Sequence, residues 1–354
     1  MKILAIETSC DETCAAVTKG RRALSSVVSS QIEIHRAWGG VVPQLARRAH
    51  EERIGPVVAE ALKKGLGLKR KEGWEEIIEE GMGQIEAVAV TYGPGLAIAL
   101  GVGIDFAKKL SLKYEKKLVA VNHIEGHLLS AWVQDEKGQV EREPELPALA
   151  LTVSGGHSSL VLVERIGKYE LVGETLDDAA GEALDKAAKI LGLPYPGGPE
   201  IEREARRGDK KYLELPRPMS RSPLLNYSFA GLKTAFYYKV REMEEQKKKE
   251  RLADLAASFQ TAVFDTLLKK YIKAIERFKP KSLIAVGGVL ANQVLRERVE
   301  KLGKEKGLPV YLPQLRSLNM DNAAMIGVAA YYKVKRGEVV EKLEELEREA
   351  RAKL

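Results

Sequence analysis

Two histidines, His123 and His127, are the residues of this chain with the clearest potential for chemistry. They lie in the stretch VNHIEGHLLSAW, which follows the short apolar run 118–121 and is predicted to start a helix. A spacing of four residues places both imidazoles on one face of a helix. With a carboxylate from elsewhere in the chain, two neutral imidazoles form a ligand set typical of non-haem iron or catalytic zinc. The alternative, a pair of histidines on the helix surface, stays open on spacing alone.

The same histidine spacing occurs in the zinc-protease helix H-E-x-x-H, where a glutamate directly after the first histidine serves as the general base. In this chain that position is Ile124, and the acid comes one residue later at Glu125. One residue rotates a helical side chain by roughly 100°, so Glu125 should point away from the histidine face. The sequence therefore argues against a metalloprotease.

A third metal ligand must come from another part of the chain, and Asp321 is the preferred candidate. It follows the strand-like run PVYLP and opens a helix-like run, so it should lie at the ligand-facing edge of a sheet. Asp321 and Asn322 also stand where a helix N-cap is expected, and capping is the commoner role for a single aspartate in such a place. The pattern alone leaves both roles open.

Four turns, each after an apolar strand, indicate a nucleotide site. Glycine-rich strand ends bind phosphate because glycine lets backbone N–H groups approach the anion. None of the four is G-x-G-x-x-G or G-x-x-x-x-G-K-[ST], so neither a dinucleotide fold nor a P-loop fits. The last turn also leads from a strand into a helix, which points a helix N-terminus at a phosphate. The turns are ETSCDET (7–13), GPGL (93–96), SGGH (154–157) and VGGV (286–289).

Two of these turns belong to similar units, which predicts an internal duplication. Residues 3–17 read strand, polar turn, strand, and ALALTVSGGHSSLVLV (148–163) has the same plan. The charged segment 65–83 is predicted to be a surface excursion, and VVEKLEELEREARAKL (339–354) a solvated surface helix. Helical periodicity is predicted over 41–64, 177–191 and 252–278.

Composition and charge favour a soluble protein with an anionic partner. The chain has 354 residues, of which 45% are apolar and 30% charged, and this length suits roughly two domains. Its 57 Lys and Arg against 50 Asp and Glu leave a net charge of +7, which favours a partner such as nucleic acid. With only two cysteines and no apolar run near the roughly 18 residues of a membrane span, we expect a cytoplasmic protein without disulfides. Basic residues gather at 63–71, 206–211, 217–221 and 246–251, where solvated faces are the alternative.

A series of stretches resembles the TsaD family, the tRNA N6-adenosine threonylcarbamoyltransferases related to the older-named glycoproteases. They occur in family order from residue 3 to about 330, and the YPGGP and SFAGLKT forms resemble the bacterial branch. The resemblance implies an α/β fold of the actin, sugar-kinase and Hsp70 type (ASKHA), with two duplicated lobes and a nucleotide cleft between them. We expect an N-terminal lobe at 1–121 and a C-terminal lobe at 122–354 that carries the metal site, with the last helix packing back on the N-terminal lobe. The stretches are IETSCDET, QLARRAH, TYGPGL, NHIEGHLLS, TVSGGH, LDDAAGEALDKAAKILGLPYPGGP, SFAGLKT, SFQTAV, GGVLAN and MDNAAM.

The resemblance also implies a reaction. Threonylcarbamoyl-AMP, supplied by a TsaC-like synthase, would donate its threonylcarbamoyl group to N6 of the adenosine next to the anticodon in tRNAs that read ANN codons, releasing AMP. In the family one iron or zinc ion is held by the residues that match His123, His127 and Asp321. The implied partners are the tRNA, a TsaB-like paralogue and a TsaE-like ATPase. The residues that match the family's site for the adenylate, or for ATP or ADP, are Thr152, Val153, Ser154, Gly155, Gly156, Asp185, Gly198, Glu202 and Asn292.

Asp11 and Glu12, in the turn of the first hairpin, are the candidate catalytic acids. The N6 atom of adenine is a poor nucleophile, so we expect these carboxylates to accept its proton or to position the donor. The chain departs from the family pattern at Cys14, Leu184 and 318–320. These departures could alter packing around the predicted site or the choice of metal, but none removes a predicted ligand.

Two other functions remain as alternatives. A non-catalytic, nucleotide-binding partner subunit of the same complex would share the fold, but such paralogues lack the histidine pair that this chain keeps. A kinase of the same fold would need a sugar pocket and an acidic base, and it has no use for His123 and His127. The retained ligand positions favour the transferase.

Overall fold

The chain divides into two units, with boundaries after residues 143 and 312, in the computed structural model. Unit 1 contains residues 1–143 and 313–354, and unit 2 contains residues 144–312. This division differs from the expected lobe boundary after residue 121, because the segments that follow residues 121 and 312 pack on the first sheet. The structure describes residues 1–69, 71–135, 137–138, 143–313 and 318–354.

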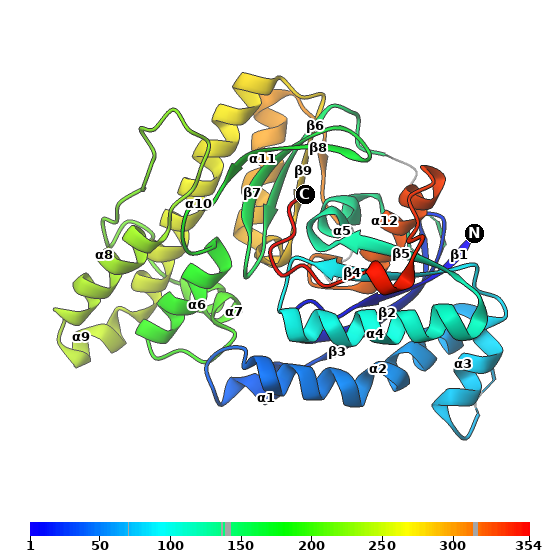
Figure 1. Ribbon diagram of the computed structural model, residues 1–354. Coiled ribbons are helices and arrows are strands. Elements are labelled where there is room, and N and C mark those ends of the chain that lie inside the picture. Colours follow the sequence, from blue (N-terminus) through cyan, green and yellow to red (C-terminus); the bar gives the residue numbers. More distant parts are fainter. Residues whose placement is uncertain (70, 136, 139–142, 314–317) are drawn as a thin grey trace. The chain divides into compact units, whose positions relative to one another are not determined.

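Unit 1 is built on one five-stranded mixed sheet (Figure 1). Its strands are β1 (Lys2–Glu7), β2 (Glu12–Lys19), β3 (Arg22–Ser30), β4 (Ala87–Gly93) and β5 (Lys117–Asn122). In the order β3-β2-β1-β4-β5, the first three form an antiparallel meander, and β4 and β5 continue it in parallel. The central strands β1 and β4 read as continuous apolar runs because both of their faces are covered. The predicted first hairpin is confirmed, with Ala5 paired to Ala16.

Helices cover both faces of this sheet. They are α1 (Ile32–Arg36), α2 (Pro43–Leu66), α3 (Trp74–Met82), α4 (Ala97–Tyr114), α5 (His123–Leu129), the 3-10 turn η1 (Ser130–Trp132) and α12 (Ala323–Lys335). On one face, Leu4 and Ile6 of β1 pack with α2 and α4 in a buried apolar cluster. On the other face, Gly327 of α12 lies against Thr18, which pairs with Ile3. Successive residues of β1 therefore point to opposite faces of the sheet and pack against the helices on both sides.

Unit 2 repeats the strand order of unit 1. Its strands are β6 (Ala148–Val153), β7 (Ser158–Arg165), β8 (Lys168–Glu174), β9 (Ser282–Val286) and β10 (Val310–Tyr311). β8, β7 and β6 form the antiparallel meander, and β9 and β10 continue from β6 in parallel. The order β8-β7-β6-β9-β10 matches β3-β2-β1-β4-β5 strand for strand. This match confirms the predicted duplication and the ASKHA-type α/β fold class.

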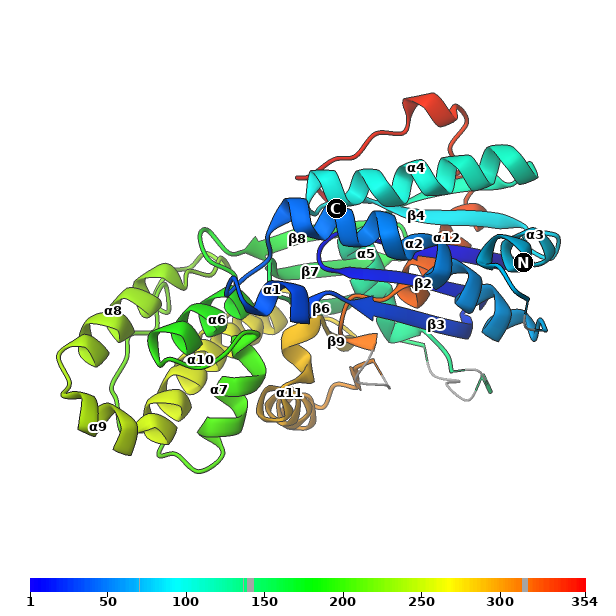
Figure 2. The same ribbon diagram turned by 90° about the horizontal axis from the view of Figure 1, so that it is seen from below.

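The long connection between β8 and β9 holds most helices of unit 2. They are α6 (Ala180–Ile190), α7 (Gly197–Ala205), α8 (Ala230–Arg241), α9 (Glu245–Glu250) and α10 (Leu252–Phe278), and β9 is followed by η2 (Gly288–Ala291) and α11 (Gln293–Lys306). Figure 2 shows α6 to α10, coloured green to yellow, as one group. The hydroxyl of Tyr271 on α10 hydrogen-bonds to the carbonyl oxygens of Leu149 and Ile284, which fixes α10 against β6 and β9. None of the helices in the described ranges combines the length and apolar sequence that a membrane span needs.

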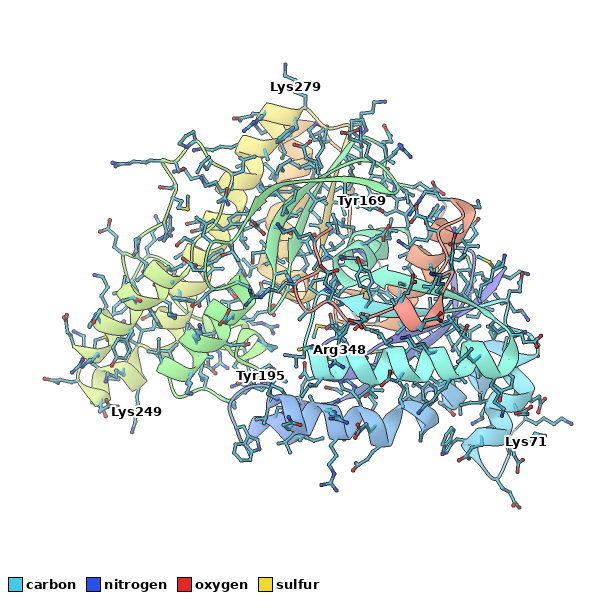
Figure 3. The ribbon with its side chains drawn as sticks, viewed as in Figure 1. Lys71, Tyr169, Tyr195, Lys249, Lys279 and Arg348 are labelled. Atoms are coloured by element: carbon cyan, nitrogen blue, oxygen red, sulfur yellow. The ribbon has the colours of Figure 1, made fainter. Side chains whose placement is uncertain are left out.

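The segment 339–354 is not the surface helix that its mixed charge predicted. Apart from the 3-10 turn η4 (Leu343–Glu345), it runs as an irregular strap along unit 1. The N–H of Glu349 donates to the carbonyl of Tyr92 at 2.8 Å, and Arg348, labelled in Figure 3, lies beside α4. Apolar side chains of the strap also pack against the core of unit 1. These tertiary contacts satisfy the backbone and bury apolar surface, so they outweigh the local preference for a helix.

The charged segment 65–83 is more than the predicted surface excursion, because α3 packs closely on α2. A Cβ at Gly55 would collide with the ring of Trp74, and one at Gly81 would crowd Leu62. The two glycines therefore let the helices approach each other. Close packing of this kind buries one face of α3 and leaves its glutamates on the other.

Candidate functional site

The two histidines lie on α5, which begins directly at the end of β5. Asn122 caps this helix, because its side-chain oxygen accepts hydrogen bonds from the N–H of Ile124 at 2.8 Å and of Glu125 at 3.3 Å. Such a cap explains why the strand turns into a helix at His123. The imidazoles of His123 and His127 are buried, and their ring centroids lie 4.6 Å apart with the ring planes at 84°. The predicted spacing thus brings both rings together on one helix face.

Asp321 approaches the histidines from the loop before α12. Its Oδ1 lies 3.1 Å from Nε2 of His127 and 3.6 Å from Nε2 of His123. The N-cap of α12 is Asn322, whose side-chain oxygen accepts a hydrogen bond from the N–H of Met325 at 3.0 Å. The capping role considered for Asp321 therefore belongs to its neighbour, and the Asp321 carboxylate faces the histidines.

The three side chains form a group that could hold a metal ion. One ligand atom of each lies within 4.8 Å of the others. Among the described residues, neither ring nitrogen of the buried His127 makes a hydrogen bond. Because buried polar atoms normally have partners, an unsatisfied imidazole beside a carboxylate fits a metal ligand. Two imidazoles and one carboxylate suit zinc or non-haem iron.

Glu125 does not take the position of a protease general base. It is buried, and its carboxylate lies 3.6 Å from the Arg336 guanidinium and 3.9 Å from the Lys333 ammonium near the end of α12. This placement agrees with the rotation expected from a displacement of one residue. The site therefore keeps the histidine spacing of a zinc protease without its catalytic glutamate.

A further carboxylate lies at this site, that of Glu7 at the end of β1, which the sequence patterns did not identify as a candidate. It is fully buried, and its Oε2 lies 3.1 Å from Nδ1 of His123. Burial by itself lowers the pKa of His123, but the carboxylates of Asp321 and Glu7 raise it to about 9. Burial raises the pKa of Glu7, and the nearby His123 outweighs this effect and lowers it. The available signal was an acid within an otherwise apolar strand, directly before a polar turn.

The two candidate catalytic acids lie where β1 turns into β2. Asp11 and Glu12 are almost buried, with 7% and 8% of their surfaces exposed. Burial, followed by the negative charges of Asp321 and Asp11, raises the pKa of Glu12 well above its ordinary value. Clusters in which one carboxyl group keeps its proton are typical of sites of acid–base chemistry.

Two of the four predicted turns, ETSCDET and the glycine-bearing GPGL, meet in unit 1. The N–H of Leu96 donates to the carbonyl of Ser9 at 2.8 Å, and Gly95 lies so close to Ser9 that a Cβ would collide with it. Gly103 of α4 likewise lies against the side chain of Thr8. The glycines of GPGL and α4 therefore serve close packing around the first turn.

The other two turns, SGGH and VGGV, meet in unit 2. The N–H of Ser154 donates to the carbonyl of His157 at 2.8 Å, which closes the first of them. Gly287 has a φ of +100°, and a Cβ there would collide with the backbone of Val153. Only glycine therefore allows this approach. The predicted residues Thr152 to Gly156 form the end of β6 and the start of the SGGH turn, whose two glycines are exposed.

Asp185 on α6, one of the predicted adenylate residues, holds the start of α7. Its Oδ1 accepts hydrogen bonds from the N–H of Gly197 at 2.8 Å and of Gly198 at 3.1 Å. Gly198, also a predicted adenylate residue, has open space where a Cβ would stand. The turn YPGGP thus brings backbone N–H groups to Asp185 in the middle of α6.

Asn292 and Glu202, the remaining predicted adenylate residues, meet at the start of α11. Asn292 caps α11, and its side-chain amide donates to Oε1 of Gln260 at 2.7 Å. Oε1 of Glu202 accepts from the N–H of Gln293 at 3.0 Å, which ties α7 to α11. The first N–H groups of α7 and α11 are thus bound by Asp185, Glu202 and Asn292, so these residues fix the two helix starts.

Comparison with known proteins decides the family. The family model described as TsaD, tRNA N6-adenosine threonylcarbamoyltransferase, matches residues 22–328. The chain belongs to the TsaD family. It is 48% identical over 341 residues to the protein of that name from Anaeromyxobacter sp. strain Fw109-5, and the match covers 96% of each chain. Its relative from Clostridium perfringens strain 13 is 44% identical over 340 residues, covering 96% of this chain and 94% of the relative.

A solved structure supports the fold of this TsaD-family chain. The crystal structure of full-length HypF in its phosphate- and nucleotide-bound form is similar with a TM-score of 0.56 and 13% sequence identity. The similarity covers 94% of this chain and 56% of the HypF chain. At this identity the likeness concerns the fold alone, and the resemblance to the TsaD family found in the sequence is confirmed by the family match.

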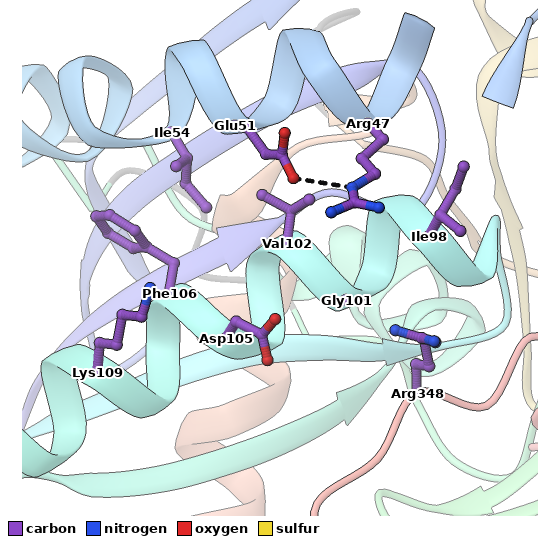
Figure 4. Close-up of a pocket in the computed structure, with 10 residues that line it drawn as sticks. All are labelled: Arg47, Glu51, Ile54, Ile98, Gly101, Val102, Asp105, Phe106, Lys109 and Arg348. Atoms are coloured by element: carbon purple, nitrogen blue, oxygen red, sulfur yellow. Dashed lines mark hydrogen bonds and ion pairs between the residues drawn. The ribbon is translucent and has the colours of Figure 1, made fainter. Parts of the chain in front are cut away.

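Membership of the TsaD family does not explain a pocket of about 380 Å³ in unit 1 (Figure 4). It lies between α2 and α4, where Arg47 pairs with Glu51 at 2.8 Å. Asp105 and Lys109 of α4 and Arg348 of the strap complete its polar lining. Charges of both signs line it, so the pocket favours no one class of ligand, and the metal group is not part of its lining.

We expect Glu12 to make this TsaD-family protein less stable as the pH rises above the ordinary carboxyl pKa of 4.5. Below that pH both the folded and the unfolded chain keep the proton. Above it the unfolded chain releases the proton while burial holds it in the folded state, so stability falls until the raised folded pKa is reached. Glu12→Gln cannot titrate, and its Tm in the presence of a chelator should exceed the wild-type Tm by about 2 °C or more at pH 7. The gain should shrink towards pH 4.5, and a Tm difference independent of pH would contradict this explanation.

Proposed function

We propose that this protein transfers the threonylcarbamoyl group of threonylcarbamoyl-AMP to N6 of the adenosine next to the anticodon in tRNAs that read ANN codons. The products are N6-threonylcarbamoyladenosine and AMP. One observation carries the proposal: His123, His127 and Asp321 converge within 4.8 Å in a chain that matches the TsaD family over residues 22–328. A non-catalytic partner subunit would have no use for this group, so that alternative has no support.

The proposed metal is one divalent ion, zinc or iron, held by the Nε2 atoms of His123 and His127 and the carboxylate of Asp321. When bound, it supplies Lewis acidity toward the carbonyl or phosphate oxygens of the donor. The protein supplies the ligand arrangement, because α5 presents both imidazoles and the loop before α12 brings the carboxylate to within 3.1 Å of His127 Nε2. Burial of both imidazoles limits competition from water for their ring nitrogens.

Asp11 and Glu12 are proposed to act on the proton of adenosine N6. As N6 forms its bond to the carbamoyl carbon, the C–O bond to AMP breaks and N6 loses a proton. Burial and nearby negative charges raise the pKa of Glu12, which favours its protonated form, so we assign the role of proton acceptor to Asp11. Glu12 would then use its O–H to hold an oxygen of the donor.

The adenylate part of the donor is proposed to bind to unit 2. The exposed glycines of the SGGH turn let backbone N–H groups approach a phosphate, and the starts of α7 and α11 lie in the same unit. Asp185, Glu202 and Asn292 hold these helix starts in place through hydrogen bonds of 2.8 to 3.3 Å. ATP or ADP would bind through the same features.

The direct test is a transfer assay. The purified protein is incubated with threonylcarbamoyl-AMP, unmodified tRNA and the TsaB-like and TsaE-like partners, and the nucleosides are read by mass spectrometry. N6-threonylcarbamoyladenosine that depends on this protein supports the proposal. A lack of product despite bound metal and nucleotide would favour the non-catalytic subunit or another donor. The partners, the supply of donor by a TsaC-like synthase and the cytoplasmic location stay predictions.

For the tRNA we propose a basic surface of unit 2. The clusters 206–211 and 246–251 lie close together, because the N–H of Asp209 donates to Oδ1 of Asp254 at 2.7 Å, directly after the second cluster. Phosphate contacts dominate the affinity of proteins for nucleic acids. Five exposed cations of these clusters, which we call the α7–α9 basic surface, are Arg207, Lys210, Lys211, Lys247 and Lys249.

The two other basic clusters are less suited to bind tRNA. Lysines of the 63–71 cluster pair with glutamates of α2 and α3, which neutralises their charge within unit 1. Arg70 of that cluster lies outside the described residues. In the 217–221 cluster, Arg217 is bound by Asp265 at 2.7 Å and is half-buried. Arg217 therefore supports the fold of unit 2.

Changing Lys210, Lys211 and Lys249 together to glutamate should weaken tRNA binding at least about tenfold. Each lost phosphate contact should also reduce the steepness of log affinity against log salt by about 0.9. Filter binding or fluorescence anisotropy across a salt series measures both quantities.

The matched control for this variant changes Lys63, Lys64 and Lys71 to glutamate. It alters the net charge by the same amount on unit 1, so it should leave the salt dependence of tRNA binding near that of the wild type. An equal loss of affinity in both variants would indicate a general effect of net charge and would refute the α7–α9 basic surface as the contact.

A further inference from the structure

We propose that Glu7 is a positioning residue that holds His123 in the one tautomer able to bind metal through Nε2. The inference rests on the metal site of the proposed function and adds a residue to it. Glu7 does not touch the ligand position itself. It acts through the far side of the His123 ring.

Both carboxylate oxygens of Glu7 are used in this role. The carboxylate is fully buried at the end of β1. Its Oε1 accepts a hydrogen bond from the N–H of Ser9 at 2.5 Å, and its Oε2 accepts one from Oγ1 of Thr91 at 2.6 Å. The same Oε2 lies 3.1 Å from Nδ1 of His123. Three donors from β4, α5 and the first turn therefore converge on one rigidly held acid.

The two nitrogens of His123 face different groups. Nδ1 faces Glu7 and the hydroxyl of Ser9, each at 3.1 Å, whereas Nε2 faces Asp321 Oδ1 at 3.6 Å. An imidazole that binds a metal through one nitrogen carries its one N–H on the other, and an ionised carboxylate can only accept. Glu7 therefore draws the proton to Nδ1 and leaves the lone pair of Nε2 directed toward Asp321. Carboxylates placed in this way orient metal-binding histidines and raise their basicity.

His127 lacks this support among the described residues. Its buried Nδ1 has no hydrogen-bond partner there, while its Nε2 lies 3.1 Å from Asp321 Oδ1. The two ligands of the proposed site thus differ in how the protein holds them. His123 is held on its Nδ1 side by Glu7 and Ser9, and of these two only Glu7 carries a charge that fixes the tautomer.

Glutamine at position 7 keeps the shape of Glu7 but cannot keep its hydrogen bonds. If the amide oxygen takes the place of Oε2, the NH₂ group meets the N–H of Ser9, which is a donor facing a donor. If the NH₂ group takes that place, it faces Nδ1 of His123 and drives the proton to Nε2, where it blocks the metal. Either orientation weakens metal binding without creating a cavity.

The experiment compares Zn²⁺ affinity in the full-length wild type, Glu7→Gln and Glu125→Gln by competition with a chelator. Glu125 is the matched control, because it is a buried carboxylate on α5 that pairs with Lys333 and Arg336. Loss of an outer-shell carboxylate typically weakens metal binding 10–100-fold. We expect a loss of about that size in Glu7→Gln and an affinity within about threefold of the wild type in Glu125→Gln. Thermal unfolding of each variant shows whether the fold is retained.

A second measurement reads the tautomer directly. The chain has 5 histidines, so ¹⁵N-histidine labelling and long-range ¹H–¹⁵N correlation can resolve the signals of His123 in the Zn²⁺-loaded wild type. The signals that are missing from the spectrum of His123→Ala identify this residue. We expect the metal on Nε2 and the proton on Nδ1. If Glu7 only supported the fold, the His123 proton would not have to lie on Nδ1.

Equal Zn²⁺ affinity in Glu7→Gln and Glu125→Gln, or a proton on Nε2 of His123 in the loaded protein, would overturn the proposal. A wild type that binds no Zn²⁺ would overturn both this inference and the metal site on which it rests. If Glu7→Gln weakens Zn²⁺ binding as expected but the wild type yields no product in the transfer assay, the proposed reaction fails and the role of Glu7 stands. The two failures are therefore distinguishable.

Discussion

Replacing His123 and His127 together by alanine should leave the protein without bound metal and lower the rate of threonylcarbamoyl transfer by at least about 10³-fold. The expected size follows from a Lewis acid that contributes several kcal/mol to transition-state stabilisation, since about 4 kcal/mol corresponds to about 10³-fold. Asp321 alone cannot replace two imidazoles that lie 4.6 Å apart on α5. Metal content by elemental analysis and product by mass spectrometry are the two readouts.

Metal removal and restoration serve as the control for this variant. Wild-type protein stripped by a chelator should lose transfer and regain it with Zn²⁺ or Fe²⁺, and the ion that restores more activity is the better cofactor. The double variant should respond to neither ion. Transfer by the metal-free double variant at a rate near that of the wild type would show that the group around α5 is not needed for the reaction.

Asp11→Asn should lower the transfer rate by about 10²–10⁴-fold, the usual contribution of a positioned general base. The change keeps the shape of the side chain and removes only its capacity to accept a proton. Glu12→Gln should also lower the rate, because an amide cannot take up or release a proton as a carboxyl group does. Single-turnover assays separate these effects from binding, and the affinity for threonylcarbamoyl-AMP should stay within about threefold of the wild type.

A suitable control for the two acids is Glu33→Gln. Glu33 lies on α1 in the same unit, is exposed and pairs with the surface residue Arg36, so its substitution should leave the transfer rate unchanged. If Asp11→Ala and Glu12→Ala both transferred at the wild-type rate with unchanged donor binding, the assignment of these residues as catalytic acids would have to be dropped.

Several features could be predicted from the sequence because they depend on neighbouring residues. The four-residue spacing of His123 and His127 placed both imidazoles on one helix face, and the displaced Glu125 pointed away from them, as helical geometry requires. The two strand–turn–strand units were visible as apolar runs broken by small polar residues, and both formed hairpins. The family motifs identified the TsaD family for the same reason, since they are short local patterns.

Other features were decided by the tertiary structure. The choice between Asp321 and Asn322 as the cap of α12 depended on where the histidines lie, and nothing near residue 321 in the chain contains that information. The role of Glu7 arises only because parallel pairing of β1 with β4 and of β4 with β5 brings their ends, and the start of α5, to one edge of the sheet.

The C-terminal strap and the basic clusters show the same limit. The mixed charge of 339–354 predicts a helix, but backbone hydrogen bonds and apolar contacts to unit 1 hold it as a strap. The lysines of 63–71 and of 206–211 look alike in the sequence, but in the structure Lys63 and Lys64 pair with Glu60 of their own helix and Lys71 pairs with Glu80 of α3. Helix periodicity, capping and turns depend on a few neighbouring residues and can therefore be predicted from the sequence. Contacts between residues far apart in the chain are set by strand order and packing.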